Sequence, residues 1–225
     1  MRLPVFHLPD DVERLAPLTF RFPLWEPKDC EDFIEALESM PDDWITPDRA
    51  EELAARPEVA GSFPDGFDLV GLIKRRRIRE FPLYSIPGFR ESWEEYCQPL
   101  MRYLETLWGC ELQEVIPPFV FCYSKQPGLK SKLEEHVDSY NTFVLPLSDE
   151  ASYVGGGTYI PEYDLTIHDV QGCPHVFPGH SFYAPPSAGG TADIFDEVVE
   201  LHPQLIHATH RVTRGSRYVL VAFFR

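Results

Sequence analysis

The pattern of apolar residues changes at Pro117, and this change limits the folds open to the chain. Before Pro117, apolar residues recur every three or four positions, which is the period of a helix that faces a core. After it, short runs of aromatic and β-branched residues alternate with glycine and proline, as strands and turns do. Helices followed by many short strands predict a mainly β fold in which N-terminal helices cover a sheet.

Three segments of the first half carry helix signals. One helix is expected over 29–37, and a second begins at Pro47 with Thr46 as its cap. The longest helix is expected over 91–108, where an apolar stripe at helical spacing indicates a packing surface. This stripe consists of Trp93, Tyr96, Leu100, Tyr103, Leu104 and Leu107.

The second half predicts a series of short strands. They are expected at 119–123, 140–147, 158–160, 165–167, 191–195, 204–208 and 217–224. Between 171 and 190, repeated proline and glycine predict a long irregular loop in place of ladder strands. Long loops in compact domains are often functional, so this loop is a candidate for contacting a substrate. Short strands with irregular turns, preceded by helices, favour a jelly roll buttressed by α-helices.

Length and composition are those of one ordinary globular domain. The 225 residues are 44% hydrophobic and 25% charged, which suffices for a core without disulfide staples. We expect a single domain over 1–225, with a helical support region at 1–116 and a β-rich core at 117–225.

Charge and targeting signals limit the partners. The formal net charge of −16 argues against binding to nucleic acid or to anionic membranes. No run approaches the roughly 20 apolar residues that cross a bilayer, and the N-terminus does not look like a signal peptide. The five cysteines are widely spaced, which favours buried free thiols. A cytoplasmic location is therefore expected.

Two histidines and one aspartate form a candidate metal site. His136 and Asp138 are two residues apart, so on a strand both side chains project to one face and can bind one ion. His207 lies between apolar neighbours, where a histidine is expected to be buried and then paired or coordinated. Two imidazoles and one carboxylate are the ligands of non-haem Fe(II) oxygenases, which leave other metal positions open.

Arg217 follows His207 by ten residues and heads the apolar run 218–224. A buried arginine needs an anion. Its planar guanidinium can hold a carboxylate through two parallel hydrogen bonds, so a bound organic acid is expected near the metal.

Three segments in this order resemble the 2-oxoglutarate and Fe(II)-dependent oxygenases of the prolyl 4-hydroxylase and lysyl hydroxylase type. They are 136–142, 155–160 and 207–218, within about residues 117–225. The resemblance implies a double-stranded β-helix, that is, a cupin-like jelly roll. It also implies that Fe(II) is held by His136, Asp138 and His207, and that Arg217 holds the distal carboxylate of 2-oxoglutarate.

The resemblance suggests three further contacts of the cosubstrate, each with a simpler alternative. Tyr123 matches a tyrosine that often offers its hydroxyl to 2-oxoglutarate, but it could equally be a core tyrosine with a backbone partner. Thr158 follows the glycines, as a threonine does in relatives. Thr142 shares the face of Asp138 if the strand is unbroken. Strands favour threonine in any case.

Other histidines compete for the ligand role. His136 and His207 are 207 − 136 = 71 residues apart, an interval longer than in compact relatives, and the excess falls in the 171–190 loop. Loop histidines are usually solvated, and the interval of ten residues before the basic residue favours His207. The competing histidines are His168, His175, His180, His202 and His210.

Two other patterns are discounted. The basic cluster 74–79 could be a localisation or nucleic-acid patch, but such a run is more often a solvated face that neighbouring acids neutralise. The glycines 155–157 lack the spacing of a phosphate-binding loop, and no helix follows them.

The expected activity is hydroxylation of an amino-acid side chain, in a peptide, a free amino acid or a natural-product intermediate. In the chemistry of such oxygenases, O2 is consumed, 2-oxoglutarate is decarboxylated to succinate, and ascorbate is a candidate reductant. Halogenases of this type lack the carboxylate ligand, so Asp138 favours hydroxylation. Two alternatives stay open: a cupin-like metalloenzyme without 2-oxoglutarate, in which Arg217 is a structural ion-pair residue, and a non-catalytic jelly-roll binding module. Substrate identity and oligomeric state cannot be predicted.

Overall fold

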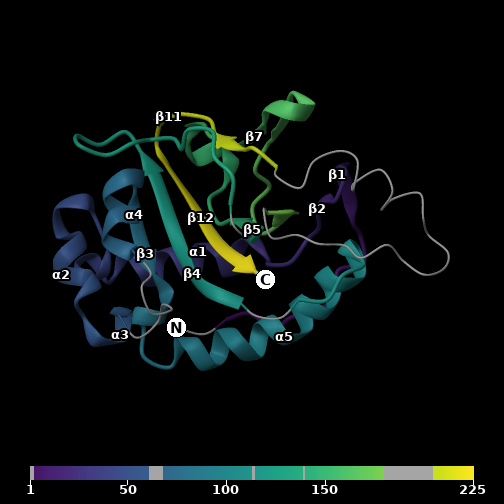
Figure 1. Cartoon of the computed structure of the whole chain (residues 1–225), viewed down its shortest axis with the longest axis horizontal. Helices are drawn as coiled ribbons and strands as arrows, with labels where there is room; N and C mark the ends of the chain where they lie inside the picture. Colours follow the sequence, from purple (N-terminus) through teal and green to yellow (C-terminus); the bar gives the residue numbers. More distant parts are fainter. Residues whose placement is uncertain (1–2, 61–67, 113–114, 139, 180–204) are drawn as a thin grey trace.

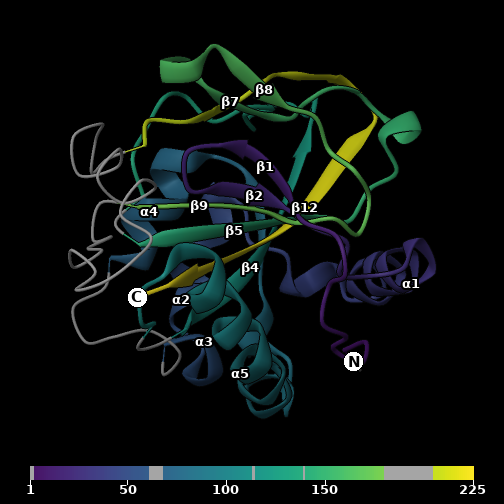
Figure 2. The same cartoon turned by 90° about the vertical axis from the view of Figure 1, so that its right-hand side faces the viewer.

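The computed structural model describes residues 3–60, 68–112, 115–138, 140–179 and 205–225 (Figure 1). These ranges form three layers, which are best seen in Figure 2. A seven-stranded antiparallel sheet lies in the middle, with two small sheets and the helices of residues 50–60 and 69–76 packed on one face and the helices of residues 27–38 and 89–108 on the other. The described part of the chain is therefore mainly β with covering helices, as the sequence pattern predicted.

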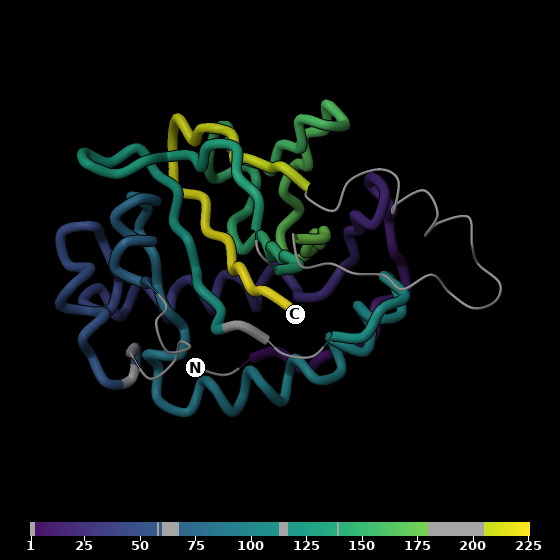
Figure 3. The backbone as a smooth tube through the Cα atoms, in the orientation of Figure 1, coloured from purple at the N-terminus to yellow at the C-terminus, as the bar shows by residue number. Residues whose placement is uncertain are grey.

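The large sheet has the strand order β1-β2-β9-β5-β12-β4-β3. Its strands are β1 (Glu13–Ala16), β2 (Thr19–Arg21), β3 (Arg79–Pro82), β4 (Val115–Ser124), β5 (Asn141–Pro146), β9 (His175–Phe177) and β12 (Ser216–Phe224). In Figure 3 the C-terminal strand β12, in yellow, runs through the middle of the molecule.

Strand β12 is apolar along its length because both of its faces are buried. Leu220 pairs with Val120 of β4 on one side and with Leu145 of β5 on the other. Leu220, Ala222 and Phe224 pack in the core under the helices, whereas Val219 and Val221 pack in the second core, between the sheets. Since side chains alternate along a strand, Arg217 lies on the same face as Val219 and points between the sheets.

The helical layer depends chiefly on α5 (Phe89–Trp108). Its stripe is buried in the core under the large sheet through Phe89, Trp93, Tyr96, Leu100, Leu104 and Trp108. The other helices are α1 (Pro27–Glu38), α2 (Ala50–Ala54), α3 (Pro57–Ala60) and α4 (Leu69–Arg76). Short 3-10 helices cover Pro41–Asp43, Pro47–Arg49, Leu83–Ser85, Glu150–Ser152 and Pro161–Tyr163.

The two small sheets face the large sheet on the side opposite α1 and α5 (Figure 2). One has the order β10-β7-β8, and the other pairs β11 with β6. Their strands are β6 (Val154–Gly155), β7 (Thr158–Ile160), β8 (Leu165–Ile167), β10 (Ala208–Thr209) and β11 (Val212–Arg214). A bridge between His136 and His207 continues the pairing next to β10.

Most of the predicted elements are confirmed. The helices expected at 29–37 and 91–108 are α1 and α5, and a helix does begin at Pro47, as a 3-10 turn that leads into α2. The capping role expected of Thr46 is wrong, because its side chain makes no capping hydrogen bond. The strands expected at 119–123, 140–147, 158–160, 165–167 and 217–224 are found. The strand expected at 191–195 lies outside the described residues, and of 204–208 only Ala208 is in a strand.

The irregular loop expected at 171–190 is wrong in its first part. Strand β9 lies there, between Pro174 and Pro178, and pairs with both β2 and β5 in the large sheet. Its three residues are too few to show alternation, and both prolines lie outside the paired residues. Residues 180–190 of the expected loop lie outside the described residues.

The first half of the chain also supplies strands, which sequence reasoning missed. β1, β2 and β3 lie at the two edges of the large sheet, and each has only three or four residues. The support region at 1–116 therefore contributes strands to the large sheet, whereas it was expected only to cover that sheet.

The cysteines are free thiols, of which Cys30, Cys97 and Cys122 are buried. Within the described ranges, none of the helices is both long enough and apolar enough to cross a membrane.

Gly172 joins the N-terminal segment to the large sheet, and its replacement tests this junction. It has φ +76°, its carbonyl accepts hydrogen bonds from the N–H groups of Leu24 and Trp25, and an added Cβ would collide with the carbonyl oxygen of Trp25. Gly128 has a similar φ of +80° with open space around it. Gly128→Ala should therefore cost about 1 kcal/mol of backbone strain, and Gly172→Ala at least about 2 kcal/mol more because of the collision.

Urea unfolding of both variants measures this difference. Equal losses of unfolding free energy in the two variants would contradict the described close contact.

Candidate metal centre

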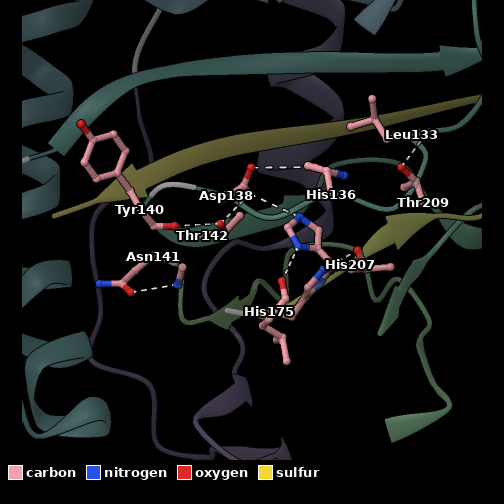
Figure 4. Close-up of polar contacts among 12 residues, drawn as sticks. Leu133, His136, Asp138, Tyr140, Asn141, Thr142, His175, His207 and Thr209 are labelled. Carbon is pink, nitrogen blue, oxygen red and sulfur yellow. Dashed lines mark hydrogen bonds and ion pairs between the residues drawn. The ribbon is translucent and has the colours of Figure 1, made fainter. Parts of the chain in front are cut away.

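His136, Asp138 and His207 come together at one point between the sheets (Figure 4). One ligand atom from each side chain lies within 4.8 Å of the other two. Nε2 of His207 is 3.3 Å from Oδ2 of Asp138, and Nε2 of His136 is 3.8 Å from Oδ1 of the same carboxylate. The three groups therefore converge in a way that suits a single ion.

The backbone sets this arrangement. The N–H of His136 donates to the carbonyl of His207, and the N–H of His207 donates to the carbonyl of His136, both at 2.9 Å. This narrow antiparallel pair brings the two imidazole ring centres to 4.3 Å from each other. Asp138, two residues after His136, reaches the same side, as the sequence spacing predicted.

Backbone carbonyls orient both imidazoles. Nδ1 of His136 lies 2.7 Å from the carbonyl oxygen of Glu134, and Nδ1 of His207 lies 3.2 Å from that of Leu205. Since a carbonyl only accepts, each Nδ1 carries the proton, and each Nε2 is the ring nitrogen left available for a metal ion. This is the tautomer that binds metals, held by the kind of outer hydrogen bond that metal-ligating histidines usually make.

Asp138 is held as a carboxylate. Burial would raise its pKa, but the close imidazoles of His207 and His136, together with the hydrogen bond from Thr142, keep the pKa at about 2. The hydroxyl of Thr142 donates to Oδ2 of Asp138 at 2.7 Å. Burial also lowers the pKa of His136, which favours a neutral imidazole. A carboxylate and a neutral imidazole are the forms that bind a divalent metal.

Arg217 is buried, and the chain itself provides its anion. Nε and Nη2 of Arg217 donate to the two carboxylate oxygens of Asp169, the second at 2.8 Å. The hydroxyl of Tyr153 donates to Oδ2 of the same carboxylate at 2.6 Å. Burial would raise the pKa of Asp169, but the charge of Arg217 keeps it below its ordinary value.

Sequence reasoning did not identify Asp169. It predicted that Arg217 would be buried and would need an anion, but nothing local distinguishes Asp169 among the 36 acidic residues. Asp169 lies between β8 and β9, and β9 itself was not predicted.

The glycines 155–157 allow the chain to pass close to Arg217. All three have positive φ, and a Cβ on Gly156 would come within 2.8 Å of Cδ of Arg217. On another side, the guanidinium lies 5.3 Å from the ring centre of Tyr123. Burial raises the pKa of Tyr123 to about 12, so its phenol stays protonated and able to donate.

Thr158 contacts His175 on β9. Its Oγ1 lies 2.9 Å from Nε2 of His175, whose Nδ1 is buried without a partner among the described residues. Burial lowers the pKa of His175 to about 3, so the ring is neutral. If Nδ1 carried the proton, its N–H would be buried without an acceptor, and buried unpaired N–H groups are rarer than buried unpaired acceptors. The proton is therefore assigned to Nε2. Nε2–H then donates to Thr158, and the threonine hydroxyl is free to donate to a ligand.

All seven site residues expected from the sequence line one inner cavity. They are Tyr123, His136, Asp138, Thr142, Thr158, His207 and Arg217. The cavity measures about 40 Å³, which is space for a few water molecules. An organic acid would enter it only if lining side chains moved.

The competing histidines do not join this group. His168 and His210 are exposed, and the only described cluster of three metal-ligating groups is the triad. His175 is fully buried in β9, so the expectation of a solvated loop histidine is wrong for this residue. His180 and His202 lie outside the described residues.

The discounted basic cluster divides into two parts. Lys74, Arg75 and Arg79 each form an ion pair with an acidic side chain, as expected of a solvated face. Arg76 differs, because it lines the inner cavity and its guanidinium lies 5.0 Å from the ring centre of Phe121. The position of Arg76 at the cavity depends on α4 lying beside β4, which no local pattern in the sequence shows.

Comparison with known proteins gives a fold but no close relative. No family model matches the chain, and no curated protein matches it. The viral collagen prolyl hydroxylase of Paramecium Bursaria Chlorella virus-1, in its 2-oxoglutarate complex, is 14% identical, with a TM-score of 0.52 over 95% of this chain and 94% of that chain. A prolyl-4-hydroxylase of Pseudomonas putida is 16% identical, with a TM-score of 0.42 over 81% and 89%.

At such identities the likeness to the viral enzyme establishes a shared fold. The viral structure is that of a prolyl hydroxylase bound to 2-oxoglutarate, and enzymes of this type are the ones that the sequence motifs resemble.

Thr142 offers a test of the metal site that leaves the three ligands in place. Thr142→Val keeps the shape of the side chain but removes the hydrogen bond to Asp138, so the affinity for Fe(II) should fall roughly 10- to 100-fold. Thr142→Ser keeps the hydroxyl and should bind Fe(II) within about threefold of the unaltered protein. Anaerobic titration with Fe(II) measures both, and equal affinities in the two variants would show that the hydroxyl does not support the ligand.

Proposed function

We propose that the chain is a non-haem Fe(II) and 2-oxoglutarate-dependent dioxygenase that hydroxylates an organic substrate. The observation that carries the proposal is the convergence of two oriented imidazoles and one carboxylate on a cavity that also holds a buried arginine. We further propose that the facing sheets form a double-stranded β-helix. The order β9-β5-β12-β4 opposite β8-β7-β10 and the His136–His207 bridge supports this arrangement.

The three ligand side chains fit Fe(II). They provide two nitrogen atoms and one carboxylate, which is the ligand set of iron oxygenases, and the nearby cavity leaves the other metal positions accessible. When bound, iron would activate O2, the oxidant, while 2-oxoglutarate would supply two electrons by its conversion to succinate and CO2, so that one oxygen atom goes to succinate and the other to the substrate. The protein side chains bind, orient and shield these groups from water.

The residues beyond the triad fit a cosubstrate carboxylate in part. Nη1 of Arg217, the hydroxyl of Thr158 and the phenol of Tyr123 are donors on the same cavity. Asp169 already neutralises Arg217. In this proposal Asp169 fixes the guanidinium so that Nη1 faces the ligand, and the cavity widens when the ligand enters.

The same ion pair favours a second candidate. A metalloenzyme without 2-oxoglutarate would use the triad alone, and Arg217 would be a structural partner of Asp169. The bidentate pair and the small cavity are the observations that support this alternative. The two candidates differ in whether Arg217 contributes to 2-oxoglutarate binding.

The double variant Asp169→Asn/Arg217→Met separates the candidates. It removes both charges of the ion pair, so that neither charge is left buried without its partner. If Arg217 binds the cosubstrate, the dissociation constant of 2-oxoglutarate should rise at least about tenfold, as expected for the loss of a charged hydrogen bond. Fe(II) affinity should stay within about threefold. Calorimetric titration of the metal-loaded protein measures the first quantity, and anaerobic Fe(II) titration the second.

Asp169→Asn alone serves as the control, since it keeps Arg217. Succinate release in air should persist in this variant at a higher Michaelis constant for 2-oxoglutarate. If the unaltered protein binds Fe(II) but neither binds 2-oxoglutarate nor forms succinate, the second candidate replaces the first.

A further inference from the structure

A second, larger pocket lies outside the inner cavity and reaches the same triad. This outer pocket measures about 430 Å³, within the usual range for small-molecule sites. It shares Arg76, Leu133, His136, Asp138 and Phe223 with the inner cavity. A molecule in the outer pocket would therefore have one end next to the metal ligands.

The outer pocket is lined by both apolar and cationic side chains. Phe119 and Phe223 provide aromatic surface. Arg75, Arg76 and Lys130 provide positive charge, although the chain as a whole is strongly acidic. Arg75 is exposed and pairs with Asp68 at 3.3 Å, so it already has a partner in water.

Arg76 is the arginine of this pocket that has unused binding capacity. Its Nη1 is buried and makes no hydrogen bond with any described residue. The nearest carboxylate oxygen is Oε2 of Glu80, at 3.5 Å, and both oxygens of this fully buried carboxylate also lack hydrogen bonds within the described ranges. A guanidinium has five N–H donors, and a long contact to one carboxylate oxygen leaves most of them unpaired.

The contrast with Arg217 shows which of the two guanidinium groups is less fully paired within the chain. Arg217 makes two hydrogen bonds to Asp169, so an internal carboxylate already occupies one side of its guanidinium. Arg76 has only the poorly aligned contact with Glu80. A new carboxylate would gain more hydrogen bonds at Arg76 than it would displace.

Arg76 is also close to the metal ligands. It is the last residue of α4, which the left-handed Arg77 ends, and its guanidinium packs on the ring of Phe121. Its charge is one of the influences that lower the pKa of His136. A ligand carboxylate on Arg76 would therefore place the attached hydrocarbon near the metal ligands and against Phe119 and Phe223.

We propose that the outer pocket binds a small carboxylic acid as substrate, with its carboxylate on Arg76 and its hydrocarbon part on Phe119 and Phe223. Describing this acid as the substrate rests on the proposed oxygenase function. A carboxylate matches a single guanidinium through paired hydrogen bonds. A phosphate group, with more charge, suits the pocket less because Glu134 and Glu135 also line it.

The test compares acids with their neutral amides, because only the charge and its hydrogen bonds differ within each pair. The probes are hexanoate with hexanamide and L-leucine with L-leucinamide. Dissociation constants are measured by ligand-observed NMR on the full chain loaded with Zn²⁺, a diamagnetic ion that supports no oxidation. Binding of 2-oxoglutarate is titrated in the same samples.

Three variants isolate Arg76. Arg76→Met/Glu80→Gln removes both charges, so that no buried carboxylate is stranded. Glu80→Gln alone keeps the guanidinium and removes its competing anion. Arg75→Met is the matched control, since it makes the same change one residue earlier in the same pocket.

The unaltered protein should bind at least one acid about tenfold or more tightly than its amide. The preference should vanish in Arg76→Met/Glu80→Gln and persist in Glu80→Gln and Arg75→Met, with 2-oxoglutarate binding unchanged. The proposal is overturned if no acid is preferred, if Glu80→Gln loses the preference as the double variant does, or if the double variant weakens 2-oxoglutarate binding instead.

Failure of the proposed function gives a different result. A protein that prefers the acid through Arg76 but does not bind 2-oxoglutarate would retain a carboxylate site, while its assignment as an oxygenase would fall.

Discussion

The backbone pair between His136 and His207 is the interaction on which the site depends. Two hydrogen bonds of 2.9 Å join segments that are 71 residues apart and place both imidazoles beside Asp138. Carbonyl groups of the same two segments then fix the ring tautomers. The site is therefore a consequence of strand pairing, since neither segment holds more than two of the three ligands.

The two guanidinium groups that line the inner cavity differ in how fully acidic side chains of the chain pair with them. Arg217 is neutralised by a buried carboxylate and is held by the glycines of 155–157 and by Tyr153, which contacts the same carboxylate. Arg76 is only weakly paired with Glu80. In our account the first guanidinium is fixed in advance for a cosubstrate and the second is available to a substrate. These assignments rest on how many hydrogen bonds each guanidinium makes within the chain: Arg217 makes two to Asp169 and is held in place, whereas Nη1 of Arg76 makes none.

Sequence reasoning predicted what depends on local pattern. The apolar run after Arg217 predicted that this arginine is buried, and the spacing of His136 and Asp138 placed both on one face. It failed where contacts depend on distant segments. Asp169, which pairs with Arg217, and Arg76, which lines the cavity, come from regions with no local signal for these positions, and β9 is too short to show alternation. The residues expected at the site could be named from motifs, but their electrostatic partners could not.

The central claim is that the triad binds Fe(II) and that 2-oxoglutarate then joins it. The most direct measurement is the visible absorption of the Fe(II)-loaded protein, without oxygen, as 2-oxoglutarate is added. The account predicts that a weak charge-transfer band appears and saturates at one equivalent, and that Asp138→Ala abolishes it. A protein that binds one Fe(II) and shows no spectral change at saturating 2-oxoglutarate would contradict the account.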